Sequence, residues 1–146
     1  MKVIILAALI LCSSFSCIHR VPLSTAQTIQ LNSNQAIGIL AESAKSATVL
    51  AIALNNSHTI SEDLTRGVLQ YTRAIADAST ASVLIQQSAR GNGEKAAAIV
   101  QLLSSIKLPS SVRDFVHGPN ANAQVISLIN LLNFSISNIN SLISGG

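Results

Sequence analysis

Apolar residues recur at alternating intervals of three and four along three long stretches of this 146-residue chain. Because such intervals average 3.5 residues, they return to one side of an α-helix, and each stretch therefore predicts a helix with one buried face. The short run 134–137 alternates as a strand would, but the longer helical pattern around it favours a helix. The predicted inward residues are Ile37, Leu40, Ala44, Ala47, Ala51 and Leu54; Leu64, Val68, Tyr71, Ile75, Ala78, Ser82, Ile85 and Ala89; and Val125, Ile129, Leu132, Ile136, Ile139 and Ile143.

Polar, glycine and proline residues mark where the predicted helices begin and end. Thr59 and Glu62 fit a capping box, in which the threonine hydroxyl and the carboxylate satisfy free backbone N–H groups at a helix start. Gly91 suits the left-handed position that follows many helix ends. The expected helices run over about residues 25–56, from Thr59 to the Gly91 break, and over 94–107 and 120–143.

The third expected helix is short and ends before Pro109. One or two further turns are expected over residues 110–117, with Ser111 as their cap. The expected inward residues of the third helix are Ala96, Val100, Leu103 and either Ile106 or the stem of Lys107. Long helices with short connections, and with Ala and Ser on their inward faces, predict an all-α fold, an antiparallel helical bundle of about four helices.

The first 16 residues have the layout of a cleaved secretory signal peptide. Met1-Lys2 is a positively charged start, residues 3–11 are uninterrupted apolar residues, and Ser14 and Ser16 are small residues before the cut. That order is typical of export signals, and nine apolar residues are too few to span a membrane. The sequence predicts a signal at 1–16, an N-terminal arm at 17–24 and one helical domain at 25–146, in a secreted, extracellular protein.

Of the two cysteines, Cys12 lies inside the predicted signal. Cleavage before Cys17 leaves one cysteine, so no internal disulfide is possible, and an intermolecular disulfide or a free thiol is expected. A lipid anchor on Cys17 is the alternative, although Ser14 stands where such signals usually carry leucine. Cleavage after Cys17 would leave no cysteine at all.

Charged residues make up 10% of the chain, and none occurs after Asp114. Cleavage removes Lys2 from nine basic residues, which leaves eight against six acidic ones. A surplus of two positive charges, spread along the chain, forms no patch that would bind nucleic acid. Hydrophobic residues make up 49% of the chain, and this high content argues against disorder.

Catalytic and metal-binding patterns are not evident in the sequence. His19, His58 and His117 lie far apart in predicted loops or the arm, and no pair has the spacing of a helical metal site. No catalytic residue, metal or cofactor is therefore expected, and an enzyme is the least favoured class. Two sequons begin at Asn55 and Asn133; in a eukaryotic secretory pathway each can carry an N-linked glycan, with Asn55 in a predicted loop as the better candidate.

The last predicted helix is uncharged and has more apolar residues than one buried face requires. The extra residues predict a face for an apolar small molecule or a protein partner: Leu128, Leu131, Phe134 and Leu142. The leading interpretation is a secreted, non-enzymatic helical binding protein. The alternative is a self-associating extracellular structural protein, a homo-oligomer. A stable membrane span is not expected, because the helix carries many Ser and Asn residues. Activity at a membrane surface is disfavoured, because interfacial helices usually carry Lys or Arg on their polar face and this helix carries none.

Overall fold

A computed structural model describes residues 25–118 and 122–144, and within these ranges the chain is helical and has no strand. The all-α prediction is confirmed. The predicted signal peptide, the arm, Cys17 and His19 lie outside the described residues. The five helices are α2 (Thr25–Asn56), α3 (Glu62–Gln87), α4 (Asn92–Ser104), α5 (Ser110–Val116) and α6 (Ala123–Ser144).

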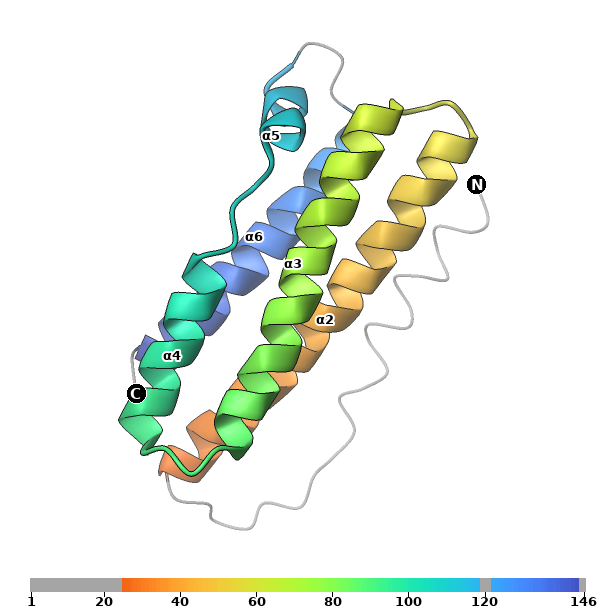
Figure 1. The fold of residues 1–146 in the computed structure, drawn as a ribbon. Helices are drawn as coiled ribbons and strands as arrows, with labels where there is room; N and C mark the ends of the chain where they lie inside the picture. The colour runs from red at the N-terminus through yellow and green to blue at the C-terminus, as the bar shows by residue number, and fades with distance from the viewer. Residues whose placement is uncertain (1–24, 119–121, 145–146) are drawn as a thin grey trace.

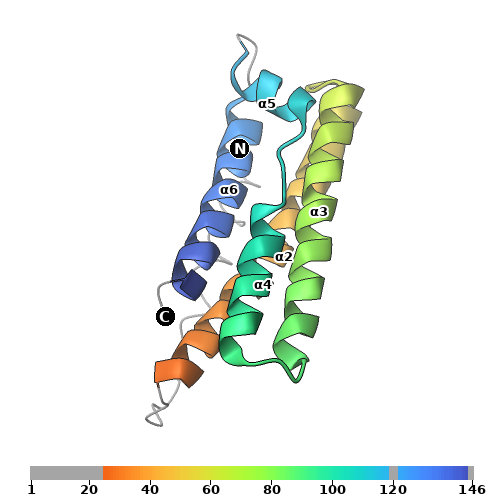
Figure 2. The same ribbon diagram turned by 60° about the vertical axis from the view of Figure 1, so that its left-hand side comes forward.

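The four longer helices run alternately up and down, and the short α5 lies at one end of them (Figure 1). Helix α2 packs against α3 and α6, and α4 packs against the same two helices from the opposite side (Figure 2). Helix α5 packs against α3. Each long helix therefore has two neighbours, and the inward faces meet in a common core.

Most of the core consists of the residues that the 3.5-residue pattern turns inward, and Ile60, Ile99 and Val112 add to them. In α2, all predicted inward residues are buried except Leu54, which is half-buried in the last turn. Ile85 and Ile143, near helix ends, and Ile136, within α6, are also half-buried, whereas Ala89 is exposed because α3 ends at Gln87. The buried aliphatic and aromatic residues are Ile37, Leu40, Ala44, Ala47, Ala51, Ile60, Leu64, Val68, Tyr71, Ile75, Ala78, Ile99, Leu103, Val112, Val125, Ile129, Leu132 and Ile139.

The start of α3 differs from the predicted capping box. Ser61 is the N-cap, and its hydroxyl accepts a hydrogen bond from the backbone N–H of Leu64 at 3.2 Å. The Thr59 hydroxyl pairs instead with the Ser57 hydroxyl at 2.8 Å. The reason is that α2 closes with His58 at φ 55°, while the Thr59 N–H bonds back to Leu54. The chain needs two more residues before it can begin the next helix.

The turn between α3 and α4 also corrects a prediction. Gly91 has φ −63° and serves as the N-cap of α4, so it is not in the left-handed conformation. Helix α3 ends instead at Ser88, whose N–H and hydroxyl both donate to the carbonyl oxygen of Ile85. The Lys95 ammonium donates to the carbonyl oxygen of Gln86 at 2.9 Å, which places a positive charge at the negative end of the α3 dipole.

Helix α4 begins two residues earlier and ends three residues earlier than predicted. Its fully buried residues are Ile99 and Leu103, whereas Ala96 and Val100 are half-buried. The prediction had missed Ile99. Beyond the end of α4, Ile106 packs against the core and Lys107 is exposed, which decides between the two predicted alternatives.

The starts of α5 and α6 also differ from expectation. Pro109 is the N-cap of α5, and no side chain caps that helix, so the predicted cap at Ser111 is wrong. Helix α6 begins at Ala123, three residues later than predicted. The Asn122 side-chain oxygen accepts hydrogen bonds from the N–H groups of Gln124 and Val125 at 2.9 and 3.3 Å, and this cap fixes the helix start.

Helix α5 approaches α3 closely at Gly67. A Cβ atom added to Gly67 would lie 2.8 Å from Cγ2 of Val112 and closer still to the Ser111 hydroxyl. Val112 itself is fully buried. Ser111 therefore contributes to this contact and not to a cap, and glycine at position 67 is what allows α5 to pack on α3.

We expect Gly67→Ala to destabilise the fold by about 1–3 kcal/mol, because the added methyl group must displace α5. The matched control is Gly38→Ala in α2, where an added Cβ would meet nothing within 4 Å. That change should stabilise the protein by up to about 1 kcal/mol through helix propensity alone. Chemical denaturation measures both, and effects of the same sign would contradict the close approach of α5.

Candidate interaction surface on helix α6

Helix α6 has an inward side that is buried and an outward side that is not. Val125, Ile129, Leu132 and Ile139 are buried in the core. Leu131, Phe134 and Leu142 are exposed at 49%, 64% and 47% of their surface. Three of the four residues of the predicted ligand or partner face are therefore exposed and lie outside the core. Leu128, the fourth residue of that predicted face, is partly buried and packs against the core, so it contributes to the fold.

The three exposed residues lie on one broad side of the helix. An α-helix turns by about 100° per residue, so Leu131 and Leu142 differ by about 20° and Phe134 lies about 60° from Leu131. The exposed polar residues Ser127 and Asn138 lie on the same side by the same count. We call Leu131, Phe134 and Leu142, together with Ser127 and Asn138, the outer α6 surface.

Two helical stretches are long and apolar enough to cross a membrane when judged by length and composition alone: Ser33–Asn56 and Ala123–Ser144. Core helices of soluble proteins pass the same test because they are buried. In α6, 17% of the most apolar stretch is buried, compared with 28% in the stretch of α2. The large apolar residues of α6 outside the buried set are either partly buried (Ile126, Leu128, Ile136 and Ile143) or exposed (Leu131, Phe134 and Leu142).

Two polar contacts connect α6 to α3 and to α4. The Tyr71 hydroxyl of α3 donates a hydrogen bond to the side-chain oxygen of Asn133. The Asn140 amide donates to the Ser104 hydroxyl of α4 at 3.3 Å. Burial raises the pKa of Tyr71 to about 12, because the phenolate would lose its hydration. These contacts hold the helix in register and orient the outer α6 surface away from the core.

The two sequons lie in different surroundings. Asn133 is in the middle of α6, and its side-chain oxygen accepts from Tyr71. Asn55 is half-buried in the last turn of α2, which extends one residue past it, so it is not in a loop as predicted. Glycosylation at either residue stays a prediction.

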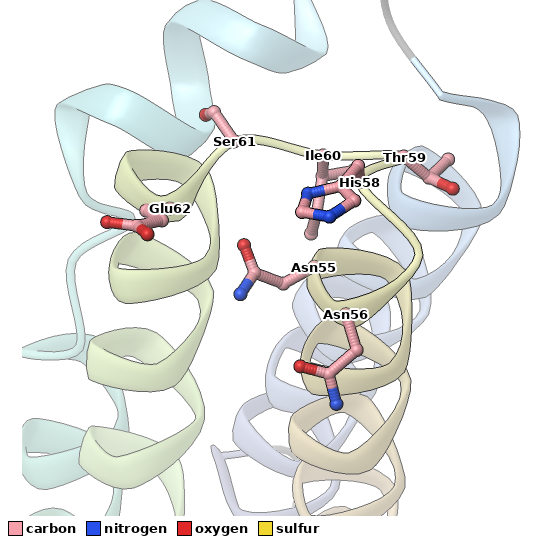
Figure 3. A pocket seen from close by; sticks show the side chains of 7 residues that line it. All are labelled: Asn55, Asn56, His58, Thr59, Ile60, Ser61 and Glu62. Atoms are coloured by element: carbon pink, nitrogen blue, oxygen red, sulfur yellow. The ribbon is translucent and has the colours of Figure 1, made fainter.

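Asn55 also lines an open hollow at the end where α2 meets α3 (Figure 3). Ile60 is the single aliphatic residue among the seven that line it, and Glu62 is the single charged one. The Asn55 side chain extends into the space between the two helices, whereas Asn56 points away from it (Figure 3). An open hollow of this kind does not resemble the enclosed apolar sites that hold lipids or other apolar molecules. The lining residues are Asn55, Asn56, His58, Thr59, Ile60, Ser61 and Glu62.

His58 and His117 are both exposed, at the end of α2 and the end of α5. Within residues 25–118 and 122–144, no three His, Cys, Asp or Glu residues lie close enough together to hold a metal ion.

Exposed aliphatic residues on the outer sides of α2 and α3 were not predicted. Because they fall between the inward positions of their helices, the 3.5-residue pattern gave no reason to single them out. Unlike the outer α6 surface, they share their helices with exposed charged residues such as Glu42, Lys45 and Arg73. The exposed residues are Ile39, Val49, Ile52, Val83 and Leu84.

No protein-family model, no curated protein and no solved structure that was compared matches this chain.

Proposed function

We propose that this protein is a secreted, non-enzymatic binding protein, folded as an antiparallel four-helix bundle, that contacts its partner through the outer α6 surface. The observation that carries the proposal is the exposure of Leu131, Phe134 and Leu142 on a helix that has no charged residue. Leaving half of such a side chain in water forgoes roughly 1 kcal/mol of burial energy per residue. Three such residues on one side of one helix favour a surface that is covered when the protein functions.

A protein partner is a better match than a small apolar ligand. Carriers of apolar molecules enclose them in a concave, mostly apolar cavity. The hollow between α2 and α3 is open, and the outer α6 surface is the convex side of a helix. Apolar residues that share one convex side of a helix are typical of contacts between helices.

The proposal can be tested with the double variant Leu131→Gln, Leu142→Gln. Both residues are about half exposed, so we expect helicity and unfolding free energy to change little, within about 1 kcal/mol. Association should weaken, as measured by native mass spectrometry of the secreted protein, which reports bound molecules and subunit count together. The matched control is Val83→Gln, Leu84→Gln on α3, which removes as much exposed aliphatic surface elsewhere. A folded Leu131/Leu142 variant that associates as the unchanged protein does would contradict the proposal.

Export is a separate part of the proposal and has its own measurement. The nine-residue apolar run after Lys2, followed by Ser14 and Ser16, supports cleavage between Ser16 and Cys17. When the full chain is expressed in a secreting host, we expect N-terminal sequencing of the secreted form to begin at Cys17 or Ile18. A product that still begins at Met1, or that stays inside the cell, would show that the segment is not a cleaved signal.

A further inference from the structure

We propose that Asn92 is a site of spontaneous covalent modification, at which the side-chain amide is lost as ammonia and the residue becomes aspartate or isoaspartate. Asn92 is the one asparagine of the chain that is followed by glycine, and it is the first residue of α4. The turn that joins α3 and α4 lies at one end of the bundle (Figure 2). The inference concerns this turn and is independent of the outer α6 surface.

The reaction is an attack by the backbone nitrogen of Gly93 on the side-chain carbonyl carbon of Asn92. Hydroxide removes the amide proton of Gly93, the nitrogen forms a bond to Cγ of Asn92, and the bond from Cγ to Nδ2 breaks. The leaving nitrogen takes a proton from water, which restores hydroxide, and departs as ammonia. Water then opens the cyclic imide at either carbonyl group and gives aspartate or isoaspartate. The net reaction consumes water, releases ammonia and needs no other reactant.

The two reacting groups are both accessible in the fold. Asn92 and Gly93 are exposed, and the Asn92 side chain makes no hydrogen bond to another residue within the described ranges 25–118 and 122–144. A Cβ atom added to Gly93 would meet nothing within 4 Å, so the space beside its nitrogen is open. Because Gly93 itself has no Cβ, no side chain of its own crowds the approach of that nitrogen to Cγ.

The place of Asn92 in the helix leaves the attacking nitrogen free. The first N–H groups of an α-helix have no intrahelical partner, and that of Gly93 is in the first turn of α4. The positive end of the helix dipole also stabilises the deprotonated, anionic form of this nitrogen. To react, Asn92 must leave its helical conformation, which disturbs the 3.0 Å hydrogen bond from the Lys95 N–H to the Gly91 carbonyl oxygen. Terminal turns open at almost no free-energy cost, and Gly91 offers no side-chain cap to hold this one closed.

The two products have different effects on α4. Aspartate places a negative charge at the positive end of the helix dipole and should leave the helix intact. Isoaspartate routes the backbone through the former side chain and lengthens it, which moves the Gly91 carbonyl oxygen away from the Lys95 N–H. Lys95 also connects the two helices, because its ammonium donates to the Gln86 carbonyl oxygen of α3 at 2.9 Å. Isoaspartate therefore loosens the junction between α3 and α4.

Incubation of the folded protein in mildly alkaline buffer, followed by peptide mapping with mass spectrometry, tests the site. The peptide that contains Asn92 should gain, with time, the mass by which a hydroxyl group exceeds an amino group, and chromatography should separate its two products. The rate should stay within about tenfold of the rate in the urea-denatured protein, because terminal turns open readily. Asn138 and Asn140 are internal controls that should react more slowly, since they lie within α6 and neither is followed by glycine.

The matched variant is Gly93→Ala. The added methyl group has open space in the fold, so helicity should not change, but it crowds the attacking nitrogen and should slow the reaction at least about tenfold. Gly38→Ala, at an equally open position in α2, should leave the rate at Asn92 unchanged. An Asn92 that stays unmodified in the folded protein, or a Gly93→Ala variant that reacts as fast as the unchanged protein, would overturn the inference.

The effect on the α3–α4 junction has a separate readout. Protein that contains isoaspartate at position 92 should unfold at a lower denaturant concentration than the Asn92→Asp variant, which carries the same charge on an unaltered backbone. Equal midpoints would show that the start of α4 contributes nothing to the junction, contrary to the inference.

Discussion

Replacing Ile75 by alanine should cost about 2–5 kcal/mol of unfolding free energy. Ile75 has no exposed surface and lies in the middle of α3, the helix that packs against α2, α4 and α5. Removing three carbon atoms there loses their burial and leaves a cavity that rigidly packed neighbours fill only in part. Chemical denaturation followed by helical circular dichroism should show the loss as a lower midpoint with an unchanged slope.

The matched control is Ile39→Ala in α2, which removes the same atoms from a side chain that is 59% exposed. Its cost should stay within about 0.5 kcal/mol, because exposed positions forfeit little burial. Comparable costs at positions 75 and 39 would mean that the inward side of α3 has been assigned wrongly. A small effect of Ile75→Ala together with a changed slope would point to loss of two-state unfolding.

Alkaline pH should destabilise the fold through Tyr71. Its pKa is raised from 10.0 to about 12 by burial in the folded protein, whereas the unfolded chain ionises with the ordinary value. Below about pH 10 both states hold the proton, and the stabilising contribution is complete. As pH rises from about 10 toward 12, the unfolded state loses its proton first, and stability falls by roughly 2–3 kcal/mol at most.

The ionisation of Tyr71 can be followed by absorbance, and a variant without the hydroxyl provides the control. Tyr71 is the one tyrosine in the chain, and there is no tryptophan, so the near-ultraviolet absorbance of phenolate reports this residue alone. The control is Tyr71→Phe, which keeps the ring in the core and leaves the exposed Asn133 to hydrogen-bond with water. The stability of this variant should fall less between about pH 10 and 12 than that of the unchanged protein, because it has no phenol to ionise. A folded-state phenol that titrates near its ordinary pKa would contradict its burial.

The apolar surplus of the last helix was evident before the structure, but its division was not. Sequence reasoning grouped Leu128 with Leu131, Phe134 and Leu142 as one face. Leu128 lies on the edge of the inward side, and whether such a residue is covered depends on how closely α6 approaches its neighbours. The structure shows it packed against the core and the other three exposed.

Helix ends were predicted less well than helix interiors, for a physical reason. Thr59 and Ser61 both offer a capping hydroxyl, and local sequence does not decide between them. The choice follows from the conformation of His58, which determines how many residues the chain needs to reverse direction after α2. In the same way, Gly91 could end one helix or begin the next. The hydrogen bonds of Ser88 and Lys95 to the last carbonyl groups of α3 end that helix before Gly91, which leaves Gly91 to begin α4.

From the sequence alone, the helical class and most of the inward residues could be predicted, because the periodicity of burial is a property of each helix by itself. The uncharged character of α6 was likewise readable without coordinates. Only the tertiary structure decided which small residues allow close packing and which polar residues join helices, as at Gly67 beneath α5 and at Tyr71 with Asn133. Those contacts link residues far apart in the chain, and their existence depends on how the helices are placed against one another, which no local pattern encodes.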